Sequence, residues 1–158
     1  VVTKCPTHMQ PIDRRIVSNT LQLASYQHLC YSSIGYAPIH LNGTPLIVTG
    51  IANPMPLLTH LQQQYPDTEL LAYPDHHIFT PQDVNRIMQK AEQYVCVVTT
   101  EKDYMRLLQT PLVEQLGDKL HVISIQTNLG IDKEAFDRQV LLYVSENNRT
   151  KPNITTLQ

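Results

Sequence analysis

The fold is decided by residues 69–83, which read Glu69-Leu70-Leu71-Ala72-Tyr73-Pro74-Asp75-His76-His77-Ile78-Phe79-Thr80-Pro81-Gln82-Asp83. The apolar run at the start is typical of a strand, and the Thr-Pro pair near the end is typical of a helix start. Between them, the polar loop 74–77 leaves the strand at its carboxyl end, where ligands bind in an open α/β sheet. An aspartate beside two histidines can move protons or hold a phosphate or a metal, so this loop raises a question of chemistry.

The same alternation of strand and helix continues on both sides of this stretch. We expect strands at 46–50, 69–73, 94–99 and 120–125, and helices at 54–65, 81–93, 102–108 and 132–146. Nearer the start, a helix is expected at 11–24 and a strand at 29–36, and residues 1–5 look like a strand already under way. Short apolar strands between amphipathic helices predict an α/β fold, with a mostly parallel sheet covered by helices on both faces.

Composition excludes several classes of protein. The chain has 158 residues, 42% hydrophobic and 16% charged, with a net charge of −2 and no basic stripe, so no nucleic-acid partner is expected. No apolar run is long enough to span a bilayer. A nucleotide-binding glycine loop, either Gly-x-x-x-x-Gly-Lys-Ser/Thr or Gly-x-Gly-x-x-Gly, is absent from these residues. We interpret the chain, which begins at Val1 rather than Met, as a fragment from which an N-terminal part has been removed.

Polar clusters follow three of the expected strands. They are Thr49 to Pro54, then the loop 74–77, then Thr99 to Asp103. If the strands are parallel, all three clusters emerge at one edge of the sheet. Backbone N–H groups after Gly50 and Thr100 would suit an anion such as phosphate, with Lys102 adding positive charge, and His76 or His77 could act as a general acid or base.

Each cluster also has a purely structural explanation. Gly50 could simply end a strand, Thr100 could cap a helix, and the Asp-His-His loop could be solvated. The coincidence of three clusters favours a functional site. We expect no metal site, because adjacent loop residues point apart and no second cluster of Asp, His or Cys supplies further ligands.

The ordered set of motifs resembles the C-terminal half of tetraacyldisaccharide 4'-kinase, the lipid A 4'-kinase of Gram-negative bacteria. The matching positions are residues 50–54, residues 74–80 with Asp83, and residues 99–103 with Arg106. Residues 2–6 are similar to a strand end of Bacteroidetes-type members, and the resemblance runs from residue 1 to about residue 145. It implies that residues 1–146 are the C-terminal α/β domain of a larger kinase whose N-terminal P-loop domain is missing. Residues 147–158 are expected to be a polar, disordered tail.

The resemblance also implies a reaction. The family transfers the γ-phosphate of ATP, bound with Mg²⁺, to the 4'-hydroxyl of tetraacyldisaccharide 1-phosphate, a lipid A precursor. Its phosphate loop, Mg²⁺-binding acids and catalytic aspartate precede residue 1, so this fragment is expected to be inactive and to hold neither cofactor. His76 would assist the catalytic aspartate, and Asp75 would orient His76. Further substrate or cleft positions would be Asn53, His77, Thr100, Glu101, Lys102 and Asp103.

The resemblance also implies where the full-length enzyme lies in the cell. The full-length enzyme would lie at the cytoplasmic face of the inner membrane, anchored outside this chain. The fragment would be soluble, and it would self-associate through apolar surface that the missing domain covers.

One alternative to the kinase function is a metal-dependent phosphoesterase of the Asp-His-His type, although its upstream aspartates and Gly-rich histidine motif are absent. The other is a non-catalytic α/β module that binds a nucleotide or a partner.

Overall fold

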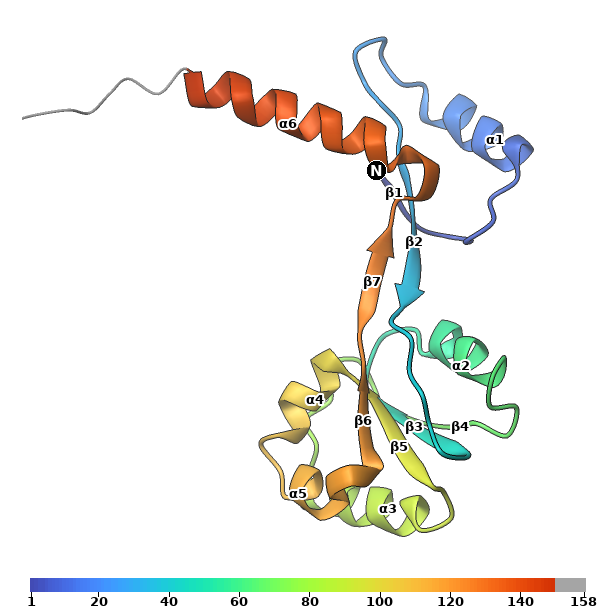
Figure 1. Ribbon diagram of the computed structural model, residues 1–158, viewed down its shortest axis with the longest axis vertical. Helices are drawn as coiled ribbons and strands as arrows, with labels where there is room; N and C mark the ends of the chain where they lie inside the picture. Colours follow the sequence, from blue (N-terminus) through green and yellow to red (C-terminus); the bar gives the residue numbers. More distant parts are fainter. Residues whose placement is uncertain (150–158) are drawn as a thin grey trace, which may run out of the picture. The chain divides into compact units, whose positions relative to one another are not determined.

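The computed structural model describes residues 1–149, which form two compact units (Figure 1). Unit 1 contains Val1–Gly35 and the chain from Thr127 onward, and unit 2 is Tyr36–Gln126. Most of the predicted tail, residues 150–158, lies outside the described residues. Residues 147–149 continue the last helix, so that helix is longer than the sequence pattern indicates. The assignment of residues 1–146 to the C-terminal domain of a larger kinase stays a prediction.

Unit 2 is built on a fully parallel four-stranded sheet in the order β4-β3-β5-β6. The strands are β3 (Pro45–Thr49), β4 (Glu69–Ala72), β5 (Cys96–Thr100) and β6 (Leu120–Ile123). The chain moves from β3 to the edge strand β4 and then crosses back to β5 on the other side of β3. This reversal makes the carboxyl ends of β3 and β5 a topological switch point, where ligands bind in open α/β sheets.

Helices cover both faces of this sheet, as the sequence predicts (Figure 1). One face packs against α2 (Met55–Gln62), and the other against α3 (Pro81–Ala91), α4 (Glu101–Leu107) and α5 (Leu112–Leu116). Successive side chains of β3 point to opposite faces of the sheet, so each face has its own hydrophobic core. Leu46 and Val48 lie in one core, and Ile47 lies in the other. The predicted α/β fold, with a mostly parallel sheet and helices on both faces, is therefore confirmed.

Helix α3 shows how locally the sequence specifies these elements. Thr80 accepts a hydrogen bond from the Asp83 backbone, and the Asp83 side chain accepts one from the Thr80 backbone, forming a capping box. Pro81 occupies the first turn, where its missing N–H costs nothing. Val84 and Ile87 follow at helical spacing and are buried. The capping box and the buried face of α3 therefore fix the end of the preceding loop, residues 74–79, at the carboxyl edge of the sheet.

Unit 1 contains most of a small sheet in the order β1-β2-β7, with two helices. Strands β1 (Val2–Cys5) and β2 (Tyr31–Tyr36) are parallel, and β7 (Ile125–Asn128) runs opposite to β2 in Figure 1. The helices are α1 (Pro11–Leu21) and α6 (Lys133–Arg149). Asp132 links these elements, because it pairs with Arg14 of α1 and accepts the backbone N–H of Tyr31 at 2.9 Å.

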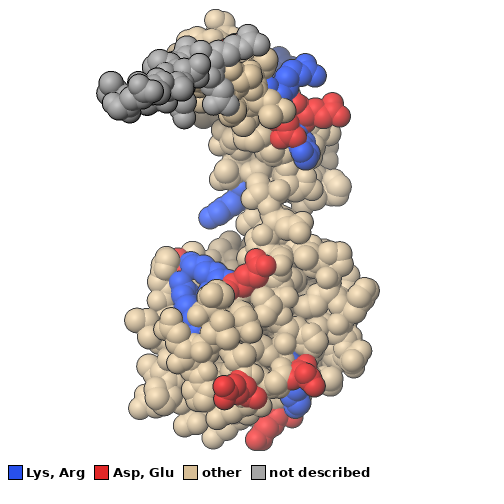
Figure 2. Space-filling view, turned by 60° about the vertical axis from the view of Figure 1, so that its left-hand side comes forward, with Lys and Arg blue, Asp and Glu red and all other residues tan. Residues whose placement is uncertain are grey.

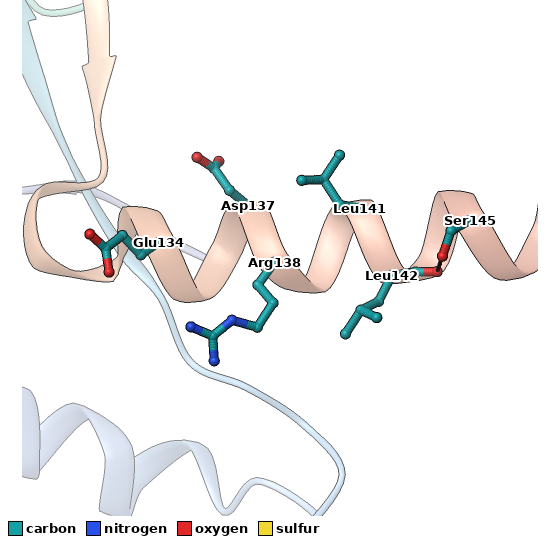
Figure 3. A pocket seen from close by; sticks show the side chains of 6 residues that line it. All are labelled: Glu134, Asp137, Arg138, Leu141, Leu142 and Ser145. Carbon is teal, nitrogen blue, oxygen red and sulfur yellow. Dashed lines mark hydrogen bonds between the residues drawn. The ribbon is translucent and has the colours of Figure 1, made fainter.

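Helix α6 carries apolar side chains on its surface. A shallow hollow along α6 is lined by Leu141 and Leu142, with polar side chains from the same helix (Figure 3). The two leucines are 67% and 55% exposed, and α1 has no buried residue. Within residues 1–149, no helix is long and apolar enough to cross a membrane.

The structure differs from the sequence prediction at three further places. The predicted strand 120–125 is two strands, β6 and β7, which separate at Ser124 and belong to different sheets. The short helix α5 was not predicted, because five residues are too few to show a period. Helix α1 ends at Leu21 rather than residue 24, because Gln22 adopts a left-handed conformation with φ 45°.

Candidate functional site

Two of the three strand-end clusters meet at the carboxylate of Asp103, which is 0% exposed. Its Oδ2 accepts hydrogen bonds from Thr49 Oγ1 at 2.5 Å, Gly50 N at 3.0 Å and Thr100 Oγ1 at 2.9 Å. Its Oδ1 accepts one from Arg106 at 3.1 Å. A buried carboxylate is tolerated when donors satisfy it in this way. Asp103 thus ties the end of β3 to the start of α4.

This arrangement accounts for two backbone N–H groups near the predicted anion positions. The Gly50 N–H, which comes just before the first group of predicted donors, donates to Asp103 at 3.0 Å, and the Asp103 N–H, which follows Thr100, donates to Thr100 Oγ1 at 3.2 Å. Anion binding by the other N–H groups after Gly50 and Thr100 stays a prediction. The structural explanation for Thr100, a helix cap, is also correct. Gly50 fits closely here, because a Cβ atom would lie 3.0 Å from the Pro74 carbonyl oxygen and would push the two segments apart.

Arg106 connects the Asp103 group to the Asp-His-His loop. Its Nη1 contacts Asp103 and lies 3.4 Å from the Gly50 carbonyl oxygen, while its Nη2 lies 3.1 Å from His76 Nδ1. His76 has a left-handed backbone, with φ 60°, and its side chain is 74% exposed. A non-glycine residue in this conformation costs about 1–2 kcal/mol, so the surrounding contacts must hold it there. Arg106 belongs to the matched motif, but its contact with His76 could not be seen from the sequence.

Asp75 and Lys102 form a second link between the loop and α4. Lys102 Nζ donates to Asp75 Oδ1 at 3.0 Å, and this hydrogen bond lowers the pKa of Asp75, outweighing the slight burial that would raise it. Asp75 Oδ2 lies 3.6 Å from His76 Nε2, which is longer than a hydrogen bond. Lys102, expected to offer its charge to an anion, is paired with this carboxylate. The predicted orienting role of Asp75 stays a prediction.

His77 points into different surroundings from those of His76. Its Nε2 lies 2.9 Å from Asp83 Oδ2, and its ring stacks on Tyr73 and meets the edge of Phe79. The side chain is only 23% exposed, so packing with these neighbours occupies most of it. The structure thus separates the two adjacent histidines, and His76 is the one that faces Asp75 and Arg106.

The His77–Asp83 contact gives a prediction about acid stability. Partial burial would raise the pKa of Asp83, but hydrogen bonds from the Thr80 backbone and side chain and from His77 lower it to about 2. Since the folded pKa lies below the unfolded value of about 3.9, the stabilisation is present above about pH 4 and is lost as the pH falls toward about 2. In urea titrations, Asp83→Asn should unfold more easily than wild type at neutral pH, and the difference should shrink below about pH 4. The exposed Asp118→Asn is the control; a gap for Asp83→Asn that stays constant with pH would contradict the prediction.

Two predicted cleft residues lie apart from this group. Glu101 accepts a hydrogen bond from Ser124 at 2.6 Å, and the exposed Asn53 accepts the Met55 backbone N–H at 3.3 Å. Their contacts are those of local structure, and their assignment to a substrate cleft stays a prediction. Figure 2 shows basic and acidic side chains side by side on the surface, with broad uncharged areas around them. Among residues 1–149, no three His, Cys, Asp or Glu side chains are placed to hold a metal ion.

The sequence that carries these contacts is similar to known proteins along most of its length. A family model described as tetraacyldisaccharide-1-P 4'-kinase matches residues 4–145. The chain belongs to the tetraacyldisaccharide 4'-kinase family. Tetraacyldisaccharide 4'-kinases from Bacteroides thetaiotaomicron and Phocaeicola vulgatus are 31% and 33% identical to it, each over 94% of the chain. The Flavobacterium johnsoniae kinase is 31% identical over 93%.

The matched region is only part of those relatives. The chain spans about half of their length, with 47%, 46% and 45% covered in the three kinases named above. No solved structure matches the chain significantly. Membership of the tetraacyldisaccharide 4'-kinase family confirms the resemblance inferred from the motifs, and it favours the kinase prediction over a phosphoesterase or a non-catalytic module.

Proposed function

We propose that this chain is the C-terminal part of a lipid A kinase that transfers the γ-phosphate of ATP to the 4'-hydroxyl of tetraacyldisaccharide 1-phosphate. The observation that carries the proposal is the joining of three family motifs around Asp103, Arg106 and His76 at the switch point of the parallel sheet. His76 assists a catalytic aspartate supplied by the other half of the protein. The lipid substrate approaches this edge, near Lys102 and Asp75.

ATP and Mg²⁺ belong to the other half of the protein in this proposal. The proposal is supported by the use of the Gly50 N–H, which donates to Asp103 within this chain. Phosphoryl transfer depends mostly on positioning and charge stabilisation. The contribution of this chain is therefore to place His76 and to shape one wall of the substrate site. The isolated chain is inactive, and the full-length enzyme works at the cytoplasmic face of the inner membrane.

Genetic complementation tests the proposed function. The full-length gene that encodes this chain is expressed in a Gram-negative strain depleted of its own 4'-kinase. We expect growth and 4'-phosphorylated lipid A precursors to be restored by the full-length gene and not by residues 1–158 alone. Accumulation of unphosphorylated tetraacyldisaccharide 1-phosphate despite good expression of the full-length protein would contradict the function. Rescue by the isolated chain would contradict its proposed inactivity.

Self-association of the isolated chain is a separate prediction. Helices α1 and α6 expose large apolar side chains, among them Ile12 and Ile16 on α1 and Leu141 and Tyr143 on α6. Exposed apolar surface of this kind favours association in water. Light scattering should show an apparent mass that rises with concentration, and Leu141→Gln with Tyr143→Gln should reduce the rise. Glu134→Gln on the same helix is the control; a constant monomer mass at high concentration would refute the prediction.

A further inference from the structure

The contact between Arg106 and His76 determines which ring nitrogen of His76 carries the proton. Arg106 Nη2 lies 3.1 Å from His76 Nδ1. Arginine stays protonated in proteins and can only donate hydrogen bonds, so Nδ1 must accept through its lone pair. A neutral imidazole has one N–H group, and here it must be on Nε2.

Arg106 is itself held by groups that leave it little freedom. Its Nη1 donates to the buried Asp103 Oδ1 at 3.1 Å and lies 3.4 Å from the Gly50 carbonyl oxygen. The planar guanidinium fixes the direction of Nη2 once Nη1 is engaged. Asp103 is in turn fixed by Thr49, Gly50 and Thr100 at the ends of β3 and β5. The position of the Arg106 donor is therefore set by the buried edge of the sheet rather than by the exposed loop.

We propose that Arg106 is a positioning residue that holds His76 as the neutral Nε2–H tautomer and presents that N–H to a carboxylate. In this structure, the carboxylate nearest to Nε2 is Asp75, at 3.6 Å, while Lys102 occupies the other oxygen of Asp75. The left-handed backbone of His76 is consistent with a side chain held in one direction against strain. In the full-length protein, the recipient is the catalytic aspartate, and this part of the inference rests on the proposed function.

The tautomer gives His76 a defined role in proton movement. With Nδ1 accepting from Arg106 and Nε2 donating, His76 has no free lone pair with which to remove a proton from the substrate. The proton of the substrate hydroxyl therefore goes to the catalytic carboxylate, and His76 keeps its own proton while it orients that carboxylate. This division matches the general-base aspartate of other phosphoryl-transfer enzymes.

Nuclear magnetic resonance of the histidine ring nitrogens in the isotope-labelled chain tests the tautomer without any kinase activity. The spectrum is recorded at about pH 8.5, where an ordinary imidazole is neutral. We expect only the Nε2–H form for His76, whereas the exposed His40 of the same unit should populate both tautomers. Arg106→Gln should return His76 to the mixture seen for His40. A wild-type His76 that matches His40, or that carries its proton on Nδ1, would overturn the proposal even if the variant failed to fold.

Kinetics of the full-length protein test the positioning role. Arg106→Lys keeps the positive charge but loses the planar guanidinium, which donates to Asp103 and His76 at the same time. We expect kcat to fall by about 10- to 100-fold, the usual cost of losing a residue that orients a functional side chain. In a His76→Ala background, the same Arg106 substitution should have almost no further effect on kcat, because its effect passes through His76. An equal loss in both backgrounds would show that Arg106 acts independently of His76. The thermal stability of each variant, measured alongside, identifies any loss caused by unfolding.

Discussion

Replacing His76 by alanine in the full-length kinase is expected to lower kcat by about 10²- to 10⁴-fold, because the group that orients the general base is lost. The imidazole is the exposed end of a chain of contacts that begins at the buried Asp103 and passes through Arg106. In the proposed mechanism, its removal leaves the catalytic aspartate without the N–H that orients it. The KM for the lipid should change much less, since His76 acts on the transition state.

Two further variants separate chemistry from folding in this experiment. His76→Asn suits the left-handed backbone better than alanine does, so it keeps the loop conformation while it removes the imidazole. His77→Ala removes the neighbouring ring, which binds Asp83 and stacks on Tyr73, so it should lower stability more than kcat. Unchanged turnover in both His76 variants would remove His76 from the mechanism. A larger loss of kcat in His77→Ala would assign the role to the other histidine.

Replacing Asp103 by alanine is expected to lower the free energy of unfolding of this chain by about 2–4 kcal/mol. The substitution leaves the Thr49 hydroxyl and the Gly50 N–H without their acceptor in a buried place, and it leaves Arg106 without its carboxylate. Unpaired buried donors and charges are among the few changes that destabilise a protein by this much. Urea unfolding followed by circular dichroism measures the effect.

The conservative variant and a surface control make this prediction specific. Asp103→Asn keeps the shape of the side chain but removes its charge, and its amide NH₂ group cannot accept the hydrogen bonds that the carboxylate accepts. We therefore expect it to lower the free energy of unfolding almost as much as Asp103→Ala does. Asp67→Ala removes an exposed aspartate of the same unit and should change the free energy of unfolding by less than about 0.5 kcal/mol. Equal effects of the Asp103 and Asp67 substitutions would contradict the role given to Asp103.

The architecture of unit 2 was predictable from the sequence, because its signals are local. Alternating apolar side chains and capping residues, such as Thr80 before Pro81, mark its strands and all of its helices except α5 without reference to distant residues. The separation of β6 from β7 was not predictable, because Ser124 lies between the two strands with no turn signal. Apolar side chains continue from Leu120 to Ile125, and only tertiary contacts assign Ile125 to a different sheet from Leu120–Ile123.

The candidate site was predictable as a place but not as a set of contacts. Parallel strands bring three clusters to one edge, and that inference needs only strand direction. The direction of each side chain depends on backbone angles and packing that the sequence does not display. The left-handed turn at His76, the stacking of His77 on Tyr73 and the use of the Gly50 N–H by Asp103 are of this kind.

We propose that this chain supplies half of the active site of a lipid 4'-kinase. Transfer of a radiolabelled γ-phosphate from ATP to tetraacyldisaccharide 1-phosphate by the full-length protein tests this, with wild type and His76→Asn side by side. We expect labelled 4'-phosphorylated lipid from wild type, and at least about a 100-fold slower rate from a folded His76→Asn variant. No lipid phosphorylation by the folded wild-type protein, or equal rates from both proteins, would contradict the claim.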